Sequence, residues 1–165
     1  MPHTLDYPSV GVDALLAGGA HAYGDTTAVV DRDESVGFAE LHDRALRVAG
    51  GLRARGVRPG DTAALHMTNS PSFVAAYYGA LCAGAAVASI NPDQPEAALR
   101  QQPADVTAKA VVTSPVGAAT AVAAAGPEVA FVVCVPPSAT SPQTAELPEG
   151  VLEPSEFLAH EPLTG

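Results

Sequence analysis

Hydrophobic side chains recur every three or four residues from Phe38 onward, which places them on one face of a helix. The apolar positions of this face are Phe38, Leu41, Ala45, Val48, Ala49 and Leu52. Arg53 and Arg55 follow, where positive charge suits the C-terminal end of the helix dipole. Gly56 can adopt the left-handed conformation that commonly ends a helix. The pattern therefore predicts a helix that begins near Phe38 and stops at Gly56.

The period changes from helix to strand just after this helix. Arg58 to Asp61 places Pro and Gly at the two central positions of a type II turn. Residues 62–68 then alternate in the way a strand requires. Ser70 is suited to cap a new helix and Pro71 to occupy its first position, and helical spacing continues up to Gly84. This segment is a predicted helix, turn, strand and capped helix.

The rest of the chain alternates short apolar runs with helical segments. A helix is expected over residues 12–22, followed by a hairpin of residues 27–30 and 35–36. Further strands are expected at residues 85–90, 110–113 and 130–135, and further helices at 96–102 and 116–125, with Pro103 ending or kinking the former. Continuous apolar strands between helices indicate a mostly parallel sheet with helices on both faces. The predicted fold class is α/β.

The last thirty residues differ in composition from the rest. From Pro136 to Gly150 the chain is rich in Pro, Ser and Thr, which is typical of a loop or linker. Residues 152–160 could add one or two helical turns. We therefore predict an α/β subdomain over residues 1–136, and a Pro-rich linker with a short terminal segment over 137–165.

Composition narrows the class of protein. The chain has 165 residues, of which 47% are hydrophobic and 16% charged, enough for one sizeable core. Its net charge is −10 and Lys109 is its single lysine, so neither nucleic acid nor an anionic membrane is an expected partner. The start has no secretory signal pattern, and no apolar run is long enough to span a bilayer. With Cys82 and Cys134 as reduced buried thiols, a soluble cytoplasmic protein is expected.

Candidate phosphate-binding and nucleophilic motifs are incomplete. Gly79 and Gly84 have the spacing of a Walker A loop, but Ala85 and Ala86 replace its Lys and Ser/Thr, and the motif follows a helix instead of a strand. Among the serines there is no G-x-S-x-G, and neither cysteine has a nearby histidine in the sequence. These patterns predict neither a phosphate cradle nor an activated nucleophile.

The titratable residues also form no recognisable cluster in the sequence. The histidines are His3, His21, His42, His66 and His160, and none is spaced from another as metal ligands on a helix would be. His66 lies in the alternating strand and is the one expected to make a buried hydrogen bond. The carboxylate pairs Asp31/Asp33 and Glu146/Glu149 fall in a turn and in the linker, where they serve solubility. We assign no catalytic, cofactor-binding or metal residue from these patterns.

Six short motifs follow one another in order along the chain. They are Phe38-Ala39-Glu40-Leu41, Gly56-Val57-Arg58-Pro59-Gly60-Asp61, Asn69-Ser70-Pro71, Ala80 to Ala85, Asn91-Pro92 and Ala108 to Ser114. This order resembles the front of the adenylate-forming superfamily, which includes acyl-CoA synthetases, adenylation domains and luciferases. The resemblance runs from about Leu15 to about Pro136, and Asn91-Pro92 is more similar to acyl- or aryl-acid CoA ligases than to peptide-synthetase adenylation domains.

The resemblance implies an enzyme that joins a carboxylic acid to AMP, using ATP and Mg²⁺, and then transfers the acyl group to coenzyme A. By family order, the Ser/Thr/Gly-rich phosphate loop would come after the last residue of this sequence. The Thr-Gly-Glu segment, the ribose-binding Asp and the C-terminal Lys are also absent, and Lys109 matches no family lysine. We therefore expect an N-terminal fragment that is inactive alone, binds no cofactor by itself, and needs the remainder of a ligase domain.

Two other functions remain open. A stand-alone truncated or split homologue could complement or regulate a partner enzyme, or self-associate as a homo-oligomer, through an apolar face that a partner chain covers. A third interpretation is a small-ligand module that binds at the carboxyl ends of the parallel strands.

Overall fold

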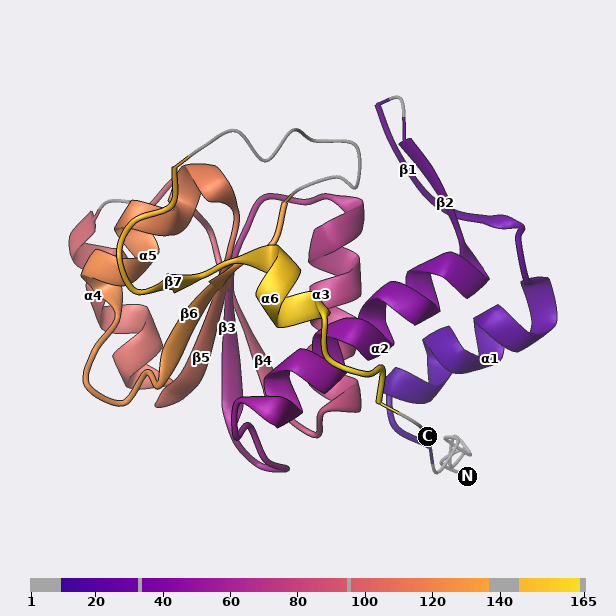
Figure 1. The fold of residues 1–165 in the computed structure, drawn as a ribbon, viewed down its shortest axis with the longest axis horizontal. Helices are drawn as coiled ribbons and strands as arrows, with labels where there is room; N and C mark the ends of the chain where they lie inside the picture. Colours follow the sequence, from indigo (N-terminus) through magenta and orange to yellow (C-terminus); the bar gives the residue numbers. More distant parts are fainter. Residues whose placement is uncertain (1–9, 33, 95, 137–145, 164–165) are drawn as a thin grey trace, which may run out of the picture.

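A computed structural model describes residues 10–32, 34–94, 96–136 and 146–163 of the chain (Figure 1). The helices are α1 (Asp13–Tyr23), α2 (Phe38–Ala54), α3 (Pro71–Cys82), α4 (Glu96–Asp105), the short 3₁₀ helix η1 (Pro115–Gly117), α5 (Ala118–Ala124) and α6 (Pro154–Leu158). The strands are β1 (Thr27–Asp31), β2 (Glu34–Gly37), β3 (Thr62–His66), β4 (Ala86–Ile90), β5 (Ala108–Thr113), β6 (Phe131–Cys134) and β7 (Val151–Leu152).

The main sheet is parallel and has five strands in the order β4-β3-β5-β6-β7. The chain runs from β3 outward to β4, then crosses back over β3 to place β5 on its other side. The direction of winding therefore reverses between β3 and β5, and in doubly wound sheets of this order ligands bind outside the carboxyl ends of the two strands that flank such a reversal. The predicted α/β fold class is confirmed.

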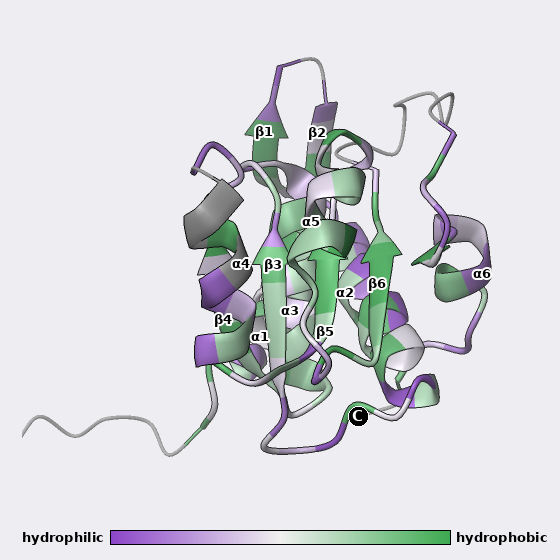
Figure 2. Ribbon diagram, turned by 90° about the vertical axis from the view of Figure 1, so that its left-hand side faces the viewer, coloured by the Kyte–Doolittle hydropathy of each residue, from purple (hydrophilic) through white to green (hydrophobic). Residues whose placement is uncertain are grey.

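Helices cover both faces of this sheet (Figure 1). On one face α2, α3 and α6 pack on Leu65, Val112 and Val133, with Val48, Leu52 and Phe157 supplied by the helices. On the other face α4 and α5 contribute Leu99, Ala121 and Ala124, which pack on Ala64, Val111 and Val132. Neighbouring strand residues thus point to opposite cores, which explains why successive residues are hydrophobic in the middle of β5 and in β6 (Figure 2).

The antiparallel hairpin of β1 and β2 is separate from the main sheet. It packs with α1 against α2 and α3 through a third apolar cluster that contains Leu16, Val36, Leu41, Ala45 and Ala75. Arg44 of α2 forms ion pairs with Glu34 of β2 at 2.9 Å and with Glu40 at 2.6 Å, which ties the hairpin to the helix. The hairpin and the three helices α1, α2 and α3 were predicted from the sequence.

The turn and the cap predicted around β3 are confirmed. Gly60 has a φ of +93°, and the Asp61 N–H donates to the Arg58 carbonyl at 3.0 Å, as a type II turn requires. The Asp61 carboxylate also accepts the Arg58 N–H at 2.7 Å. At the start of α3, Ser70 Oγ accepts the Phe73 N–H at 3.1 Å. Local sequence signals therefore position both ends of β3.

Helix α4 does not end at Pro103 but continues to Asp105, because Pro103 falls in the last turn and removes only one backbone donor. The helical turns predicted over residues 152–160 are confirmed by α6. The end of the chain also returns to the fold: β7 pairs with β6, and Phe157 of α6 is fully buried in the core over α2. The predicted linker over residues 137–145 lies outside the described residues, and the domain boundary at Pro136 stays a prediction.

Candidate functional site

His66 and Thr113 end the two strands that flank the reversal in the sheet. They are paired in the register of β3 and β5, and they are 4% and 0% exposed. His66 Nδ1 lies 3.1 Å from Thr113 Oγ1, so the hydrogen bond expected of this histidine is confirmed. The place where related topologies leave a crevice is thus closed by a bonded pair of side chains.

The hydrogen bonds of Thr113 favour one tautomer of the imidazole. Its hydroxyl has one hydrogen, which it can donate to the His66 carbonyl oxygen at 3.1 Å or to the Ser114 carbonyl oxygen at 3.3 Å. With that hydrogen so used, we assign the imidazole hydrogen to Nδ1, which donates to Thr113 Oγ1 and leaves a lone pair on Nε2. Nε2 is buried and has no hydrogen-bond partner among the described residues. Burial away from water lowers the pKa of His66 below its ordinary value, because the charged form loses hydration.

Gly117 packs directly against this pair. A Cβ placed there would come within 2.8 Å of both His66 Nδ1 and Thr113 Oγ1. Any larger residue would have to displace the imidazole or the threonine. The sequence Ser114-Pro115-Val116-Gly117 therefore brings the backbone of η1 onto the ends of β3 and β5.

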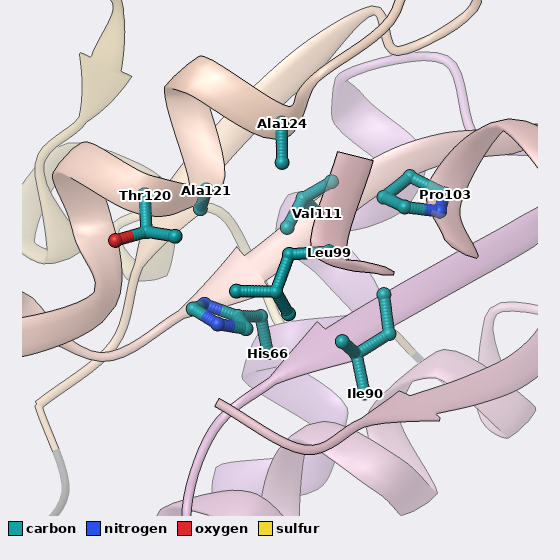
Figure 3. A pocket seen from close by; sticks show the side chains of 8 residues that line it. All are labelled: His66, Ile90, Leu99, Pro103, Val111, Thr120, Ala121 and Ala124. Carbon is teal, nitrogen blue, oxygen red and sulfur yellow. The ribbon is translucent and has the colours of Figure 1, made fainter. Parts of the chain in front are cut away.

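A small apolar cavity lies beside His66, under α4 and α5 (Figure 3). It offers about 10 Å³ to the centre of a water molecule, close to the smallest space that holds one water. Figure 3 shows the His66 ring facing Leu99, with Ala121 and Ala124 across the cavity. Its lining residues are His66, Ile90, Leu99, Pro103, Val111, Thr120, Ala121 and Ala124. Among them only His66 is titratable.

A wider cleft opens beside this cavity, at the carboxyl ends of β3 and β4. Its volume is about 440 Å³, and its lining residues are Met67, Thr68, Asn69, Phe73, Ser89, Ile90, Asn91, Pro92 and Asp93. Asn91 Oδ1 accepts the Asp93 N–H at 3.0 Å, which shapes the loop at the edge of the cleft. Hydroxyl and amide side chains and a carboxylate over apolar walls can orient a small polar ligand, but no lining residue is positively charged.

A third hollow, of about 210 Å³, lies at the end of β6 between Cys134, Glu146 and Glu153. The Cys134 thiol is 1% exposed, and burial together with the nearby Glu153 carboxylate raises its pKa to about 11. The pKa of Cys82 is also raised, mainly by burial. Both cysteines are free and protonated at neutral pH, as expected of unreactive thiols.

The other candidates of the sequence are dispersed. His21, His42 and His160 lie on α1, on α2 and after α6, Glu146 and Glu149 are exposed, and His3 and Asp33 lie outside the described residues. Within the described part of the chain, no three His, Cys, Asp or Glu side chains gather as metal ligands. Gly79 lies inside α3, where a Cβ would be 2.7 Å from Val48, so its role is close packing of α3 on α2.

Thr113 and Gly117 were not singled out from the sequence. Thr113 ends an apolar run, and Ser-Pro then starts a helical segment, so the only local signal was the end of a strand. Their proximity to His66 depends on strand order, which brings Thr113 into contact with His66 across 47 positions of the chain, and Gly117 with it.

No helix in the described part of the chain is both long and apolar enough to cross a membrane.

Comparison with known proteins identifies the family. The sequence model of the AMP-binding enzyme family matches residues 16–162, beyond Pro136, where the motifs of the sequence ended. The chain is 31% identical to a long-chain-fatty-acid–CoA ligase of Bacillus subtilis over 113 residues, which are 68% of this chain and 20% of that enzyme. It is 47% identical to pyochelin synthetase PchE of Pseudomonas aeruginosa over 76 residues, which are 46% of this chain and 5% of the synthetase.

Solved structures agree with this similarity. A benzoate CoA ligase from Burkholderia xenovorans superposes with a TM-score of 0.72 and 25% identity, over 91% of this chain and 28% of the ligase. The anthranilate CoA ligase AuaEII, in complex with anthranoyl-AMP, shares the fold with a TM-score of 0.80 and 19% identity, over 95% of this chain and 28% of that one. The chain thus spans a fifth or less of these curated relatives and under a third of these structures. It belongs to the AMP-binding enzyme family, the adenylate-forming superfamily, and corresponds to the N-terminal portion of its members.

Proposed function

We propose that this chain forms the N-terminal part of an acid–CoA ligase-like enzyme and is not catalytically competent alone. Such an enzyme would join a carboxylic acid to AMP, release pyrophosphate and transfer the acyl group to coenzyme A. The observation that carries the proposal is the family match over residues 16–162 in a chain that spans 28% of a related ligase. ATP, Mg²⁺ and coenzyme A would be bound by the complete enzyme.

The site described above supports a scaffolding role for this part. Transfer to AMP develops negative charge on phosphates, which needs a metal or positively charged donors at the reacting atoms. The cleft beside Asn69 and Asn91 has no positively charged residue among its lining residues, and the end of β3 and β5 is filled by His66 and Thr113. These residues can hold the sheet together, and the chemistry would come from segments of the enzyme that this chain does not supply.

The choice of a CoA ligase over a peptide-synthetase adenylation domain is part of the proposal. Relatives of both kinds match the chain. The match to the fatty-acid–CoA ligase extends over more of the chain, 68% against 46%, although the match to the synthetase has the higher identity. Asn91-Pro92 at the end of β4 adds support for the CoA-ligase type. The cytoplasmic location that we propose is supported only by the two unpaired cysteines and the sequence composition.

Pyrophosphate exchange tests the proposal. The purified chain should return no label from pyrophosphate to ATP with any member of a broad panel of carboxylic acids, while the related benzoate CoA ligase, assayed with benzoate, serves as the positive control. Exchange by the chain alone would overturn the inactivity that we propose. Tight nucleotide binding by the chain in calorimetry would instead favour the small-ligand module, with the cleft beside Asn91 as its site.

A second candidate function is an interaction with another chain. Strand β4 is an edge of the sheet that lacks charged residues and proline, the devices that usually protect an edge. The side chain of Val116 is also 96% exposed at the carboxyl end of the sheet. Light scattering should then show self-association, or a complex with the separately expressed remainder of a related ligase. A monodisperse monomer that forms no complex with that partner would rule this function out.

A further inference from the structure

We infer that His66 is a proton-operated latch, which holds α4 on the sheet when neutral and releases it when protonated. The inference concerns the fold of this chain and does not depend on the ligase function. It starts from the position of His66, which ends β3 between Ile90 of β4 and Thr113 of β5. The ring points into the cavity beneath α4 and α5 (Figure 3).

The bonding of the ring makes its two protonation states unequal. In the neutral state Nδ1 donates to Thr113 Oγ1, and Nε2 faces apolar surroundings with only a lone pair to satisfy. Protonation would add a positive charge and a second N–H at Nε2, for which no described residue offers an acceptor within hydrogen-bond distance. A buried donor without a partner, and above all a buried charge without one, is strongly unfavourable.

Among the described residues, no charged side chain faces His66 and compensates for this. The described side chains that face it are Ile90 from β4, Leu99 and Pro103 from α4, Val111 and Thr113 from β5, and Thr120, Ala121 and Ala124 from α5. None of these groups titrates or carries charge. Loss of hydration is accordingly the cause of the lowered pKa of His66.

The packing indicates which side of the cavity would move when His66 is protonated. Movement of the ring toward η1 is blocked, because the Gly117 backbone already lies against Nδ1 and Cε1. On the opposite side α4 covers the cavity with Leu99 and Pro103. Pro103 has no N–H to donate to the Leu99 carbonyl, so this helix lacks one of its own backbone hydrogen bonds. Water would therefore reach Nε2 most readily by a local displacement of α4.

Displacement of α4 would also alter the cleft at the ends of β3 and β4. Gln102 of α4 donates through Nε2 to Gln94 Oε1 at 2.7 Å, and the Gln94 N–H donates to the Asn91 carbonyl at 3.3 Å. Asn91 lines the cleft. The loop that shapes the cleft is thus bonded to the helix that His66 controls, and acid would change both together.

Hydrogen–deuterium exchange of the whole chain tests the latch. Protection of peptides spanning residues 91–105, corrected for the intrinsic effect of pH, should fall as the pH drops from about 6.5 toward the pKa of folded His66, by up to about tenfold per pH unit. Below that pKa it should level off, because opening then binds no further proton. Peptides from α3 should keep their protection. His66→Gln, which cannot take up the proton, should abolish the difference, and His21→Gln on the exposed face of α1 should retain it.

The latch is overturned if α3 and α4 lose protection equally, or if His66→Gln folds and still shows the pH response. If His66→Gln does not fold, imidazole ¹⁵N chemical shifts of the wild-type chain replace it. The pH at which the fall in α4 protection levels off must then coincide with the midpoint of His66 protonation, and two clearly separate pH values contradict the inference.

Discussion

Phe157 of α6 packs directly on Gly51 of α2, across 106 positions of the chain. A Cβ at Gly51 would lie 2.6 Å from the Phe157 carbonyl oxygen and 2.8 Å from its ring. Phe157 is fully buried, although it belongs to a segment whose composition suggested a tail. The contact makes α6 part of the layer that α2 and α3 form over the sheet.

The absence of a side chain at Gly51 should therefore matter for stability. Gly51→Ala should lower the free energy of unfolding by about 1–3 kcal/mol, as overpacking of a tight core does. Gly18→Ala in α1, where nothing lies within 4 Å of the new methyl group, should instead be neutral or raise it by about 0.5–1 kcal/mol. Urea unfolding followed by circular dichroism measures both. Equal effects of the two substitutions would show that α6 does not pack as described.

The Thr113 hydroxyl should stabilise the fold through its hydrogen bond to His66 as well as by filling space. Thr113→Val keeps the shape of the side chain but leaves His66 Nδ1 buried without a partner. The free energy of unfolding should therefore fall by about 1–3 kcal/mol. Thr113→Ser keeps the hydroxyl and should lose less stability than Thr113→Val, mainly because its methyl group is missing. The same urea titration at pH 7.5 compares them, and a valine variant as stable as the wild type would contradict the role of this hydrogen bond.

Stability should depend on the ionisation of His66. The pKa of folded His66 is lowered from 6.5, so the unfolded chain binds the proton more readily. The stabilisation is therefore present above about pH 6.5 and is lost as the pH falls from there toward the folded pKa, by up to about 1.4 kcal/mol per pH unit. Unfolding free energies measured between pH 8 and pH 5 should show this loss. It should persist in His21→Gln and disappear in His66→Gln.

The two thiols should react at different rates in the folded protein. Cys134 is 1% exposed with a pKa of about 11, whereas Cys82 is only partly buried. Iodoacetamide at pH 7.5 should accordingly label Cys82 slowly and Cys134 far more slowly still, because alkylation needs an accessible thiolate. Peptide mass spectrometry over a time course distinguishes them. In urea both rates should converge, and rapid native labelling of Cys134 would be inconsistent with its burial.

The local elements around β3 could be predicted from the sequence because their signals are local. Gly56, Pro59 and Gly60 control backbone dihedral angles, and Ser70 supplies a cap within three residues of its partner. The periodicity of apolar residues likewise predicted α2, α3 and the parallel sheet between helices. The family followed from the order of such motifs.

The sequence by itself thus determined the type and order of the elements, the two-sided burial of the strands and the absence of a recognisable phosphate loop. Only the tertiary structure decided that His66, Thr113 and Gly117 meet, and that Phe157 completes the core over Gly51. The physical reason is the distance at which each interaction acts. Dihedral preferences and capping act within a few residues of the chain, whereas contacts across the sheet depend on strand order, and strand order is set by how all the apolar faces are buried together.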